Sequence, residues 1–88
     1  MNRADAYTLI DAERIRQSDK WTAQHDWGVG DCSSPDVAMP VKVAVLTEET
    51  GEVARAVLDL SSVAALRAEL VQVAAVAVAW LESLPMTD

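Results

Sequence analysis

The chain has 88 residues, with seven Lys and Arg against fourteen Asp and Glu, and a formal net charge of −7. This length allows a single domain, residues 1–88, with a small core. The acid excess disfavours binding to the phosphate backbone of nucleic acids, which needs a basic surface. Cys32 is the only cysteine, so an intramolecular disulfide is excluded and a reducing compartment is favoured. A metal or a partner subunit usually stabilises so small a domain.

The apolar residues do not form a membrane-spanning run. The longest uninterrupted stretch covers residues 73–81, which is nine residues and too short for a bilayer. The first apolar residues are broken up by Arg3, Asp5 and Asp11, so we expect no secretory signal. These patterns predict a cytoplasmic oligomer that binds neither a membrane nor a nucleic acid.

A first helix is predicted over about residues 5–19. One side of this helix carries residues at steps of three and four: Tyr7, Ile10, Arg14 and Gln17. A long loop follows, from about residue 20 to residue 39, and its glycines, serines and proline show no periodicity. A loop of this length is typical of a lid or a binding segment, although a flexible connector is equally compatible with it.

A second helix is predicted from near Pro40, since proline suits a first helical position, to Asp59 or Leu60. Its apolar stripe comprises Val45, Leu46, Val53, Ala56, Val57 and Leu60.

A third helix is predicted from a cap at Ser61 or Ser62 to about Ser83. Between residues 70 and 81 it is apolar almost all round, which is typical of a helix buried on every side. Two other short helices cannot surround it, so a second subunit is expected to cover it. The predicted fold is therefore all-α, with three main helices in an oligomeric bundle.

Acidic residues lie on the apolar faces of two of these helices. At 100° per residue, Glu49 points inside the stripe of the second helix, Glu52 lies about 20° outside it, and Glu48 is farther toward the edge. On the third helix, Glu69 shares a side with apolar residues, and Gln72 follows one turn later. Two packed helices would turn these polar groups toward each other.

Such crowding needs a positive charge. Two carboxylates roughly 5 Å apart repel by about 3 kcal/mol at an effective dielectric near 20. The compensating charge can come from Arg14, Lys42, Arg55 or Arg67, or from a divalent cation held by carboxylate oxygens. The alternative is that Glu48, Glu49 and Glu52 form an ordinary solvated face, as acidic runs on helices usually do.

Two segments carry a resemblance to a known family. Residues 45–56 (VLTEETGEVARA) resemble the first signature of the MazG-like nucleotide pyrophosphohydrolases, and residues 66–75 (LRAELVQVAA) resemble the second. The family pattern is Glu-x-x-Glu followed later by Glu-x-x-Asp. Glu49, Glu52 and Glu69 match its first three acids, whereas Gln72 stands where most members have Asp. The N-terminal segment 13–25 is also similar to a small phage and bacterial subgroup.

The resemblance implies an all-α homodimer or homotetramer that uses Mg²⁺, or Mn²⁺, to hydrolyse a nucleoside triphosphate between the α and β phosphates. The biological role that it implies is house-cleaning of nucleotides. By resemblance, Glu49, Glu52, Glu69 and Gln72 are metal ligands and Glu48 orients a water. By analogy alone, the substrate is held by further residues: Arg14, Lys20, Trp21 and Lys42.

Three alternatives stay open. Because Gln72 replaces the usual Asp, the site has one negative charge fewer. The chain could therefore be a catalytically weak or inactive helical oligomer that binds nucleotides or a protein. A small acidic regulator could also dock its third helix into another protein. A zinc site at His25, Asp26, Asp31 and Cys32 is disfavoured, since it has only one His and one Cys.

Overall fold

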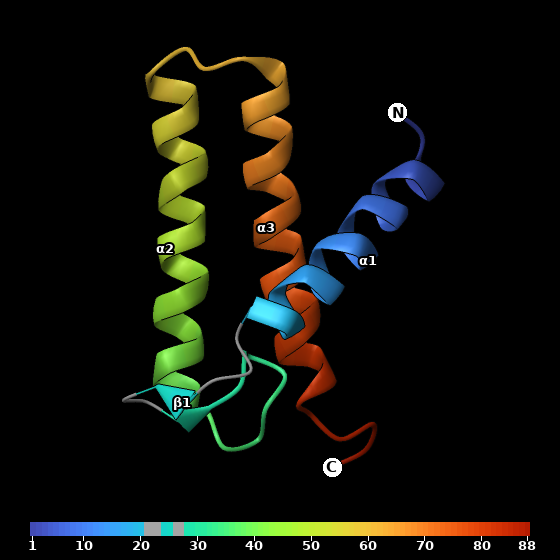
Figure 1. Ribbon diagram of the computed structural model, residues 1–88, viewed down its shortest axis with the longest axis vertical. Coiled ribbons are helices and arrows are strands. Elements are labelled where there is room, and N and C mark those ends of the chain that lie inside the picture. The colour runs from blue at the N-terminus through green and yellow to red at the C-terminus, as the bar shows by residue number, and fades with distance from the viewer. Residues whose placement is uncertain (21–23, 26–27) are drawn as a thin grey trace.

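The computed structural model describes residues 1–20, 24–25 and 28–88, and it is dominated by three helices (Figure 1). These are α1 (Arg3–Lys20), α2 (Met39–Leu58) and α3 (Val63–Glu82). The all-α prediction is confirmed, and each helix begins and ends within two residues of its predicted bounds. Two short strands, β1 (Gln24–His25) and β2 (Gly28–Val29), pair antiparallel inside the predicted loop, where no strand was expected.

The helices α2 and α3 form an antiparallel hairpin, and α1 crosses α3 near its C-terminal half (Figure 1). α3 packs against both other helices. The segment between β2 and α2 closes one end of the hairpin, at the C-terminal end of α1. In this arrangement α1, the loop after β2, α2 and α3 all contribute residues to the wall of one cavity.

The helix starts follow local sequence signals. Asn2 and Asp5 cap α1 reciprocally, because Asp5 N–H donates to Asn2 Oδ1 at 2.8 Å and Asn2 N–H donates to Asp5 Oδ2 at 3.2 Å. Pro40 lies in the first turn of α2, as predicted. Ser62 caps α3 by accepting a hydrogen bond from Ala65 N–H at 3.1 Å, which identifies it as the N-cap residue.

The C-terminal end of α2 is unusual. Ser61 N–H donates to the Ala56 carbonyl at 3.0 Å, and Leu60 N–H donates to the Val57 carbonyl at 3.2 Å, which is the Schellman pattern. That pattern usually has glycine in the left-handed position. Here the position is taken by Leu60, with φ 53° and a side chain that is 90% exposed. A leucine in this conformation stores backbone strain.

The core lies where the loop meets the hairpin. Cys32 from the loop packs with Val76 and Ala79 of α3, and Val45 and Leu46 of α2 pack against them. The loop residue thus joins the two long helices, and this half of the hairpin is better covered than the half near the α2–α3 turn.

Other apolar residues are left uncovered within the single chain. Val57 and Leu60, predicted for the stripe of α2, are exposed, as are Leu70 and Leu81 of α3. Within one chain α1 and α2 cover only part of the circumference of α3, as expected, and the cover by a second subunit stays a prediction.

Among the described residues, α3 is one helix that passes a test for membrane spans based on length and composition. The uninterrupted apolar run of nine residues is too short to cross a bilayer. The whole helix is long and apolar enough, because alanines and valines on either side of Glu69 extend its apolar character. The mostly buried core helix of a soluble protein has the same length and composition, whereas 17% of the apolar window of α3 is buried inside the single chain.

Candidate metal centre

Three glutamates from two helices converge on one point. Glu49 and Glu52 lie one turn apart on α2, and Glu69 lies on α3. One carboxylate oxygen from each lies within 4.8 Å of the other two. Helical spacing explains the pair on α2, because residues three apart share a face. The antiparallel packing of α2 and α3 supplies the third carboxylate.

The burial of this cluster is graded. Glu49 and Glu69 are half-buried, whereas Glu52 is exposed. Oε2 of Glu49 and Oε2 of Glu69 are fully shielded from solvent and have no hydrogen-bond partner among the described residues. Buried acceptors are normally satisfied, so each of these oxygens needs an explanation, of which an ion is one.

The surroundings make ionisation of both carboxyls harder. Burial, followed by the negative charges of Glu52, Glu69, Glu48 and Glu13, raises the pKa of Glu49. Burial also raises the pKa of Glu69, and the negative charge of the nearby Glu52 adds to this. Acids held in this state favour either a bound proton or a bound cation.

Most of the cations proposed to offset these charges contact other groups. Lys42 is buried and its Nζ donates to Ser83 Oγ at 2.8 Å. Arg14 pairs with Asp31 and Glu82, and Arg55 lies 3.9 Å from Asp59. Within the described part of the chain, no ion pair reaches Glu49, Glu52 or Glu69.

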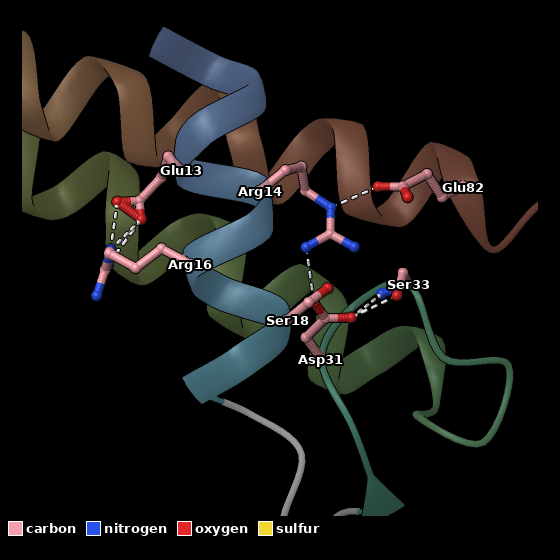
Figure 2. A network of polar contacts seen from close by, with 7 residues as sticks. All are labelled: Glu13, Arg14, Arg16, Ser18, Asp31, Ser33 and Glu82. Carbon is pink, nitrogen blue, oxygen red and sulfur yellow. Dashed lines mark hydrogen bonds and ion pairs between the residues drawn. The ribbon is translucent and has the colours of Figure 1, made fainter.

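Arg14 is the centre of a polar network that ties the loop to two helices (Figure 2). Its Nη1 contacts Asp31 Oδ2 at 2.8 Å, and its Nε donates to Glu82 at the end of α3. Asp31 also accepts hydrogen bonds from Ser18 Oγ at 3.2 Å and from Ser33 N–H at 2.9 Å. The N–H and the hydroxyl of Ser33 both donate to Asp31. These two bonds and the Arg14 charge hold the pKa of Asp31 below its usual value, although burial acts to raise it.

The other predicted site residues do not all line one cavity. Glu48 is exposed next to Glu49, and both line a cavity between the loop after β2 and the three helices. Gln72 is half-buried and lines a surface hollow between α1 and α3. Trp21 and the side chain of Lys20 lie outside the described residues, so their predicted contacts with substrate stay predictions.

Two residues of α1 join the electrostatic environment of the cluster and were not anticipated. Glu13 raises the pKa of Glu49, and Glu49 in turn helps to raise the pKa of Arg16, after the hydrogen bond from Arg16 to Glu13. Arg16 Nε donates to Glu13 at 2.7 Å. Their three-residue spacing on a helix was the available signal, but nothing in it indicated proximity to α2.

Comparison with known proteins identifies no relative. No protein-family profile matches the chain, and no curated protein and no solved structure matches it.

Proposed function

We propose that Glu49, Glu52 and Glu69 bind a divalent cation, Mg²⁺ or Mn²⁺, and that the chain is a MazG-like nucleoside triphosphate pyrophosphohydrolase. The carrying observation is the pair of buried, unpartnered oxygens of Glu49 and Glu69 beside Glu52. Oxygen ligands from carboxylates are those that hard divalent cations prefer. Two half-buried acids, each with one shielded oxygen and no counterion, would otherwise weaken the packing of α2 against α3.

In this proposal the chain's residues have distinct tasks. Glu49 and Glu69 act as partly desolvated ligands, and Glu52 supplies a third carboxylate from the solvent side. Gln72, one turn after Glu69, is a weaker neutral ligand. Glu48, which is exposed next to Glu49, orients a water. The cation, when bound, neutralises the triphosphate and stabilises the charge that develops on the leaving pyrophosphate.

Metal binding is tested by thermal unfolding in EDTA and in millimolar Mg²⁺ or Mn²⁺. A native-state site occupied at about 100 times its dissociation constant adds about 2.7 kcal/mol to the free energy of unfolding. Glu69→Gln should lose this stabilisation, whereas Asp11→Asn, which removes an exposed charge elsewhere on α1, should retain it. If neither ion stabilises the wild-type chain, the metal proposal is wrong.

Catalysis is tested separately, with a panel of nucleoside triphosphates and product analysis. Monophosphate and pyrophosphate are the expected products, whereas diphosphate and phosphate would indicate attack at a different bond. Glu52→Gln should abolish turnover without changing the mass of the assembly. Cation binding without turnover of any triphosphate would favour the second candidate, a catalytically inactive helical oligomer that binds nucleotides or a protein.

We also propose that the chain assembles as a homodimer or homotetramer in the cytoplasm. The support is the exposed apolar surface of the hairpin, which includes Leu58, Leu60, Val63, Leu70 and Leu81. Sedimentation velocity measures the mass of the assembly. Leu60→Gly should relieve the backbone strain of one chain and weaken its association, and a monomeric wild-type protein would contradict the proposal.

A further inference from the structure

A hollow with an apolar wall lies between α1 and α3, at the end of the hairpin near the α2–α3 turn. Val63, Leu66 and Leu70 from the first half of α3 line one side of it, and Ala6 and Ile10 of α1 line the other. The two helices diverge toward the N-terminus of α1 (Figure 1). Within a single chain this wall stays in contact with water, since Val63 and Leu70 are 72% and 50% exposed.

One cation stands in this apolar wall. Arg67 of α3 lines the hollow, and its guanidinium has no ion pair and no hydrogen bond among the residues that the structure describes. Arg14, Arg16 and Arg55 all have carboxylate partners, and the chain has fourteen Asp and Glu to offer. The hollow therefore suits an occupant that combines a carboxylate with apolar side chains.

The turn between α2 and α3 presents a segment with this composition. Leu58 and Leu60 are exposed and flank Asp59, and we call residues 58–60 the hairpin tip. The Asp59 carboxylate lies 3.9 Å from Arg55 Nη1, which is a long contact between two exposed side chains. Such a contact contributes little, so the Asp59 carboxylate is available to another cation.

The backbone of the hairpin tip is strained. Leu60 has φ 53°, a conformation that glycine adopts freely and leucine does not. Strain of this kind persists where the surrounding structure compensates for it. The Leu60 side chain is 90% exposed and therefore packs on little of its own chain. This points to compensation by a contact that the single chain lacks.

The hairpin tip and the hollow are neighbours in the fold, because Val63 lines the hollow and follows Leu60 by three residues. A two-fold axis close to Val63 therefore brings the tip of each of two chains to the hollow of the other. Both contacts then form in one closed, self-complementary interface. Two chains that each carry a net charge of −7 repel each other, so an attractive pair in this interface selects the mode of association.

We propose that two copies of this chain associate by reciprocal insertion of their hairpin tips. Leu58 and Leu60 of each copy enter the hollow between α1 and α3 of the other, and Asp59 pairs with Arg67 of the partner subunit. This inference rests on the self-association stated under the proposed function, and it is independent of metal binding and of catalysis.

Charge reversal tests the pairing, with sedimentation velocity over a dilution series as the measurement. Asp59→Arg brings a second cation to Arg67, and Arg67→Asp brings a second acid to Asp59, so each variant alone should weaken self-association at least tenfold. Asp11→Arg makes the same charge change at an exposed position on α1 outside the hollow and should not weaken it. Thermal unfolding confirms that each variant is folded.

An equimolar mixture of the two charge-reversed chains gives the sharpest result. The reversed tip of the Asp59→Arg chain suits the reversed hollow of the Arg67→Asp chain, and the unchanged tip and hollow suit each other. The mixture should therefore associate within tenfold of the wild-type affinity, although neither chain does so alone. A mixture that stays monomeric, or single variants that associate like the wild type, would overturn the reciprocal insertion.

A truncation pair tests the apolar part of the contact without a change of charge. Leu60→Ala shortens the hairpin tip, and Leu81→Ala removes the same group from an exposed leucine near the other end of α3. Leu60→Ala should weaken self-association at least tenfold, whereas Leu81→Ala should leave it unchanged. Equal effects, or the reverse order, would place the interface elsewhere and overturn the inference.

The same measurements separate this inference from the proposed assembly. A monomeric wild-type chain overturns both. An assembly that none of the changes at Asp59, Leu60 and Arg67 weakens retains the proposed homo-oligomer and overturns the insertion of the tips.

Discussion

Glu49 of α2 and Glu69 of α3 meet across the helical hairpin, and each has one buried carboxylate oxygen without a partner among the described residues. Packing the two helices thus shields part of two carboxylates from water at the same place. The burial that raises both pKa values also couples the stability of the hairpin to protons and cations. This coupling is measurable whether or not the protein is an enzyme.

The metal-free protein should lose stability as the pH rises. Because the pKa values of Glu49 and Glu69 are raised by folding, the folded chain holds protons that the unfolded chain releases near pH ~4.3. The free energy of unfolding from these two groups therefore falls from that pH upward through their raised pKa values. Urea unfolding in EDTA between pH 4.5 and pH 8 checks this, with Asp11→Asn as the charge control and Glu69→Gln expected to reduce the slope.

The contribution of Asp31 to the free energy of unfolding changes with pH in the opposite direction. Its pKa is lowered by folding, so its contribution to stability is present above the ordinary aspartate pKa near ~3.9 and is lost only as the pH falls through its lowered value. The two effects occupy different pH ranges. A wild-type slope above pH 4.5 that matches that of Glu69→Gln would show that the cluster does not carry the coupling.

Removing one charge from the cluster should stabilise the metal-free chain. Glu69→Gln relieves repulsion from Glu49 and Glu52, which amounts to about 1–3 kcal/mol at these separations. Asp11→Asn removes a charge from an exposed position on α1 and should change the free energy of unfolding by less than about 0.5 kcal/mol. Chemical denaturation in EDTA compares them. A destabilised Glu69→Gln would mean that this carboxylate makes a favourable contact in the native state.

The sequence was sufficient for the helices because their signals are local. Pro40 and Ser62 mark helix starts, and a period of 3.6 residues placed Glu49 inside the apolar sector and Glu52 about 20° outside it. The structure shows the same order, with Glu49 half-buried and Glu52 exposed. The convergence of Glu69 with this pair followed from the expectation that the two apolar faces pack together.

Contacts between distant parts of the chain could not be predicted in this way. Arg14 was assigned to phosphate binding, but its partners are Asp31, 17 residues away, and Glu82, 68 residues away. Helical periodicity did place Arg14 on the same side as Gln17, and both are buried, whereas Tyr7 on the predicted stripe is 63% exposed. A periodic pattern shows which residues share a face, but it does not show what covers that face.

The Arg14 network should contribute strongly to stability. Arg14→Met leaves Asp31, whose side chain is 10% exposed, without its cation, and loss of one member of a buried pair costs about 3–5 kcal/mol. Arg16→Met is the matched control, because Arg16 is 54% exposed and its pair with Glu13 is worth less than about 1 kcal/mol. Urea unfolding of both variants gives the comparison.

A double-mutant cycle shows whether the partner is correctly assigned. Arg14→Met combined with Asp31→Asn should be less destabilised than the sum of the two single variants, because the second change removes the stranded charge. Additive losses would indicate that Arg14 and Asp31 act independently. The loop wall of the cavity would then need another anchor.

Two glycine substitutions should have opposite effects. Gly51 lies within α2, and an added Cβ would meet nothing within 4 Å, so Gly51→Ala should stabilise the helix by about 0.5–1 kcal/mol. Gly30 has φ +91°, and a Cβ there would lie 3.2 Å from Ser34 Cβ. Gly30→Ala should therefore cost more than about 1 kcal/mol. Thermal unfolding of the two variants, in EDTA, measures both. A destabilising Gly51→Ala would show that the open space beside Gly51 is filled in the native assembly. Unchanged stability of Gly30→Ala would show that the loop backbone relaxes around the added methyl group.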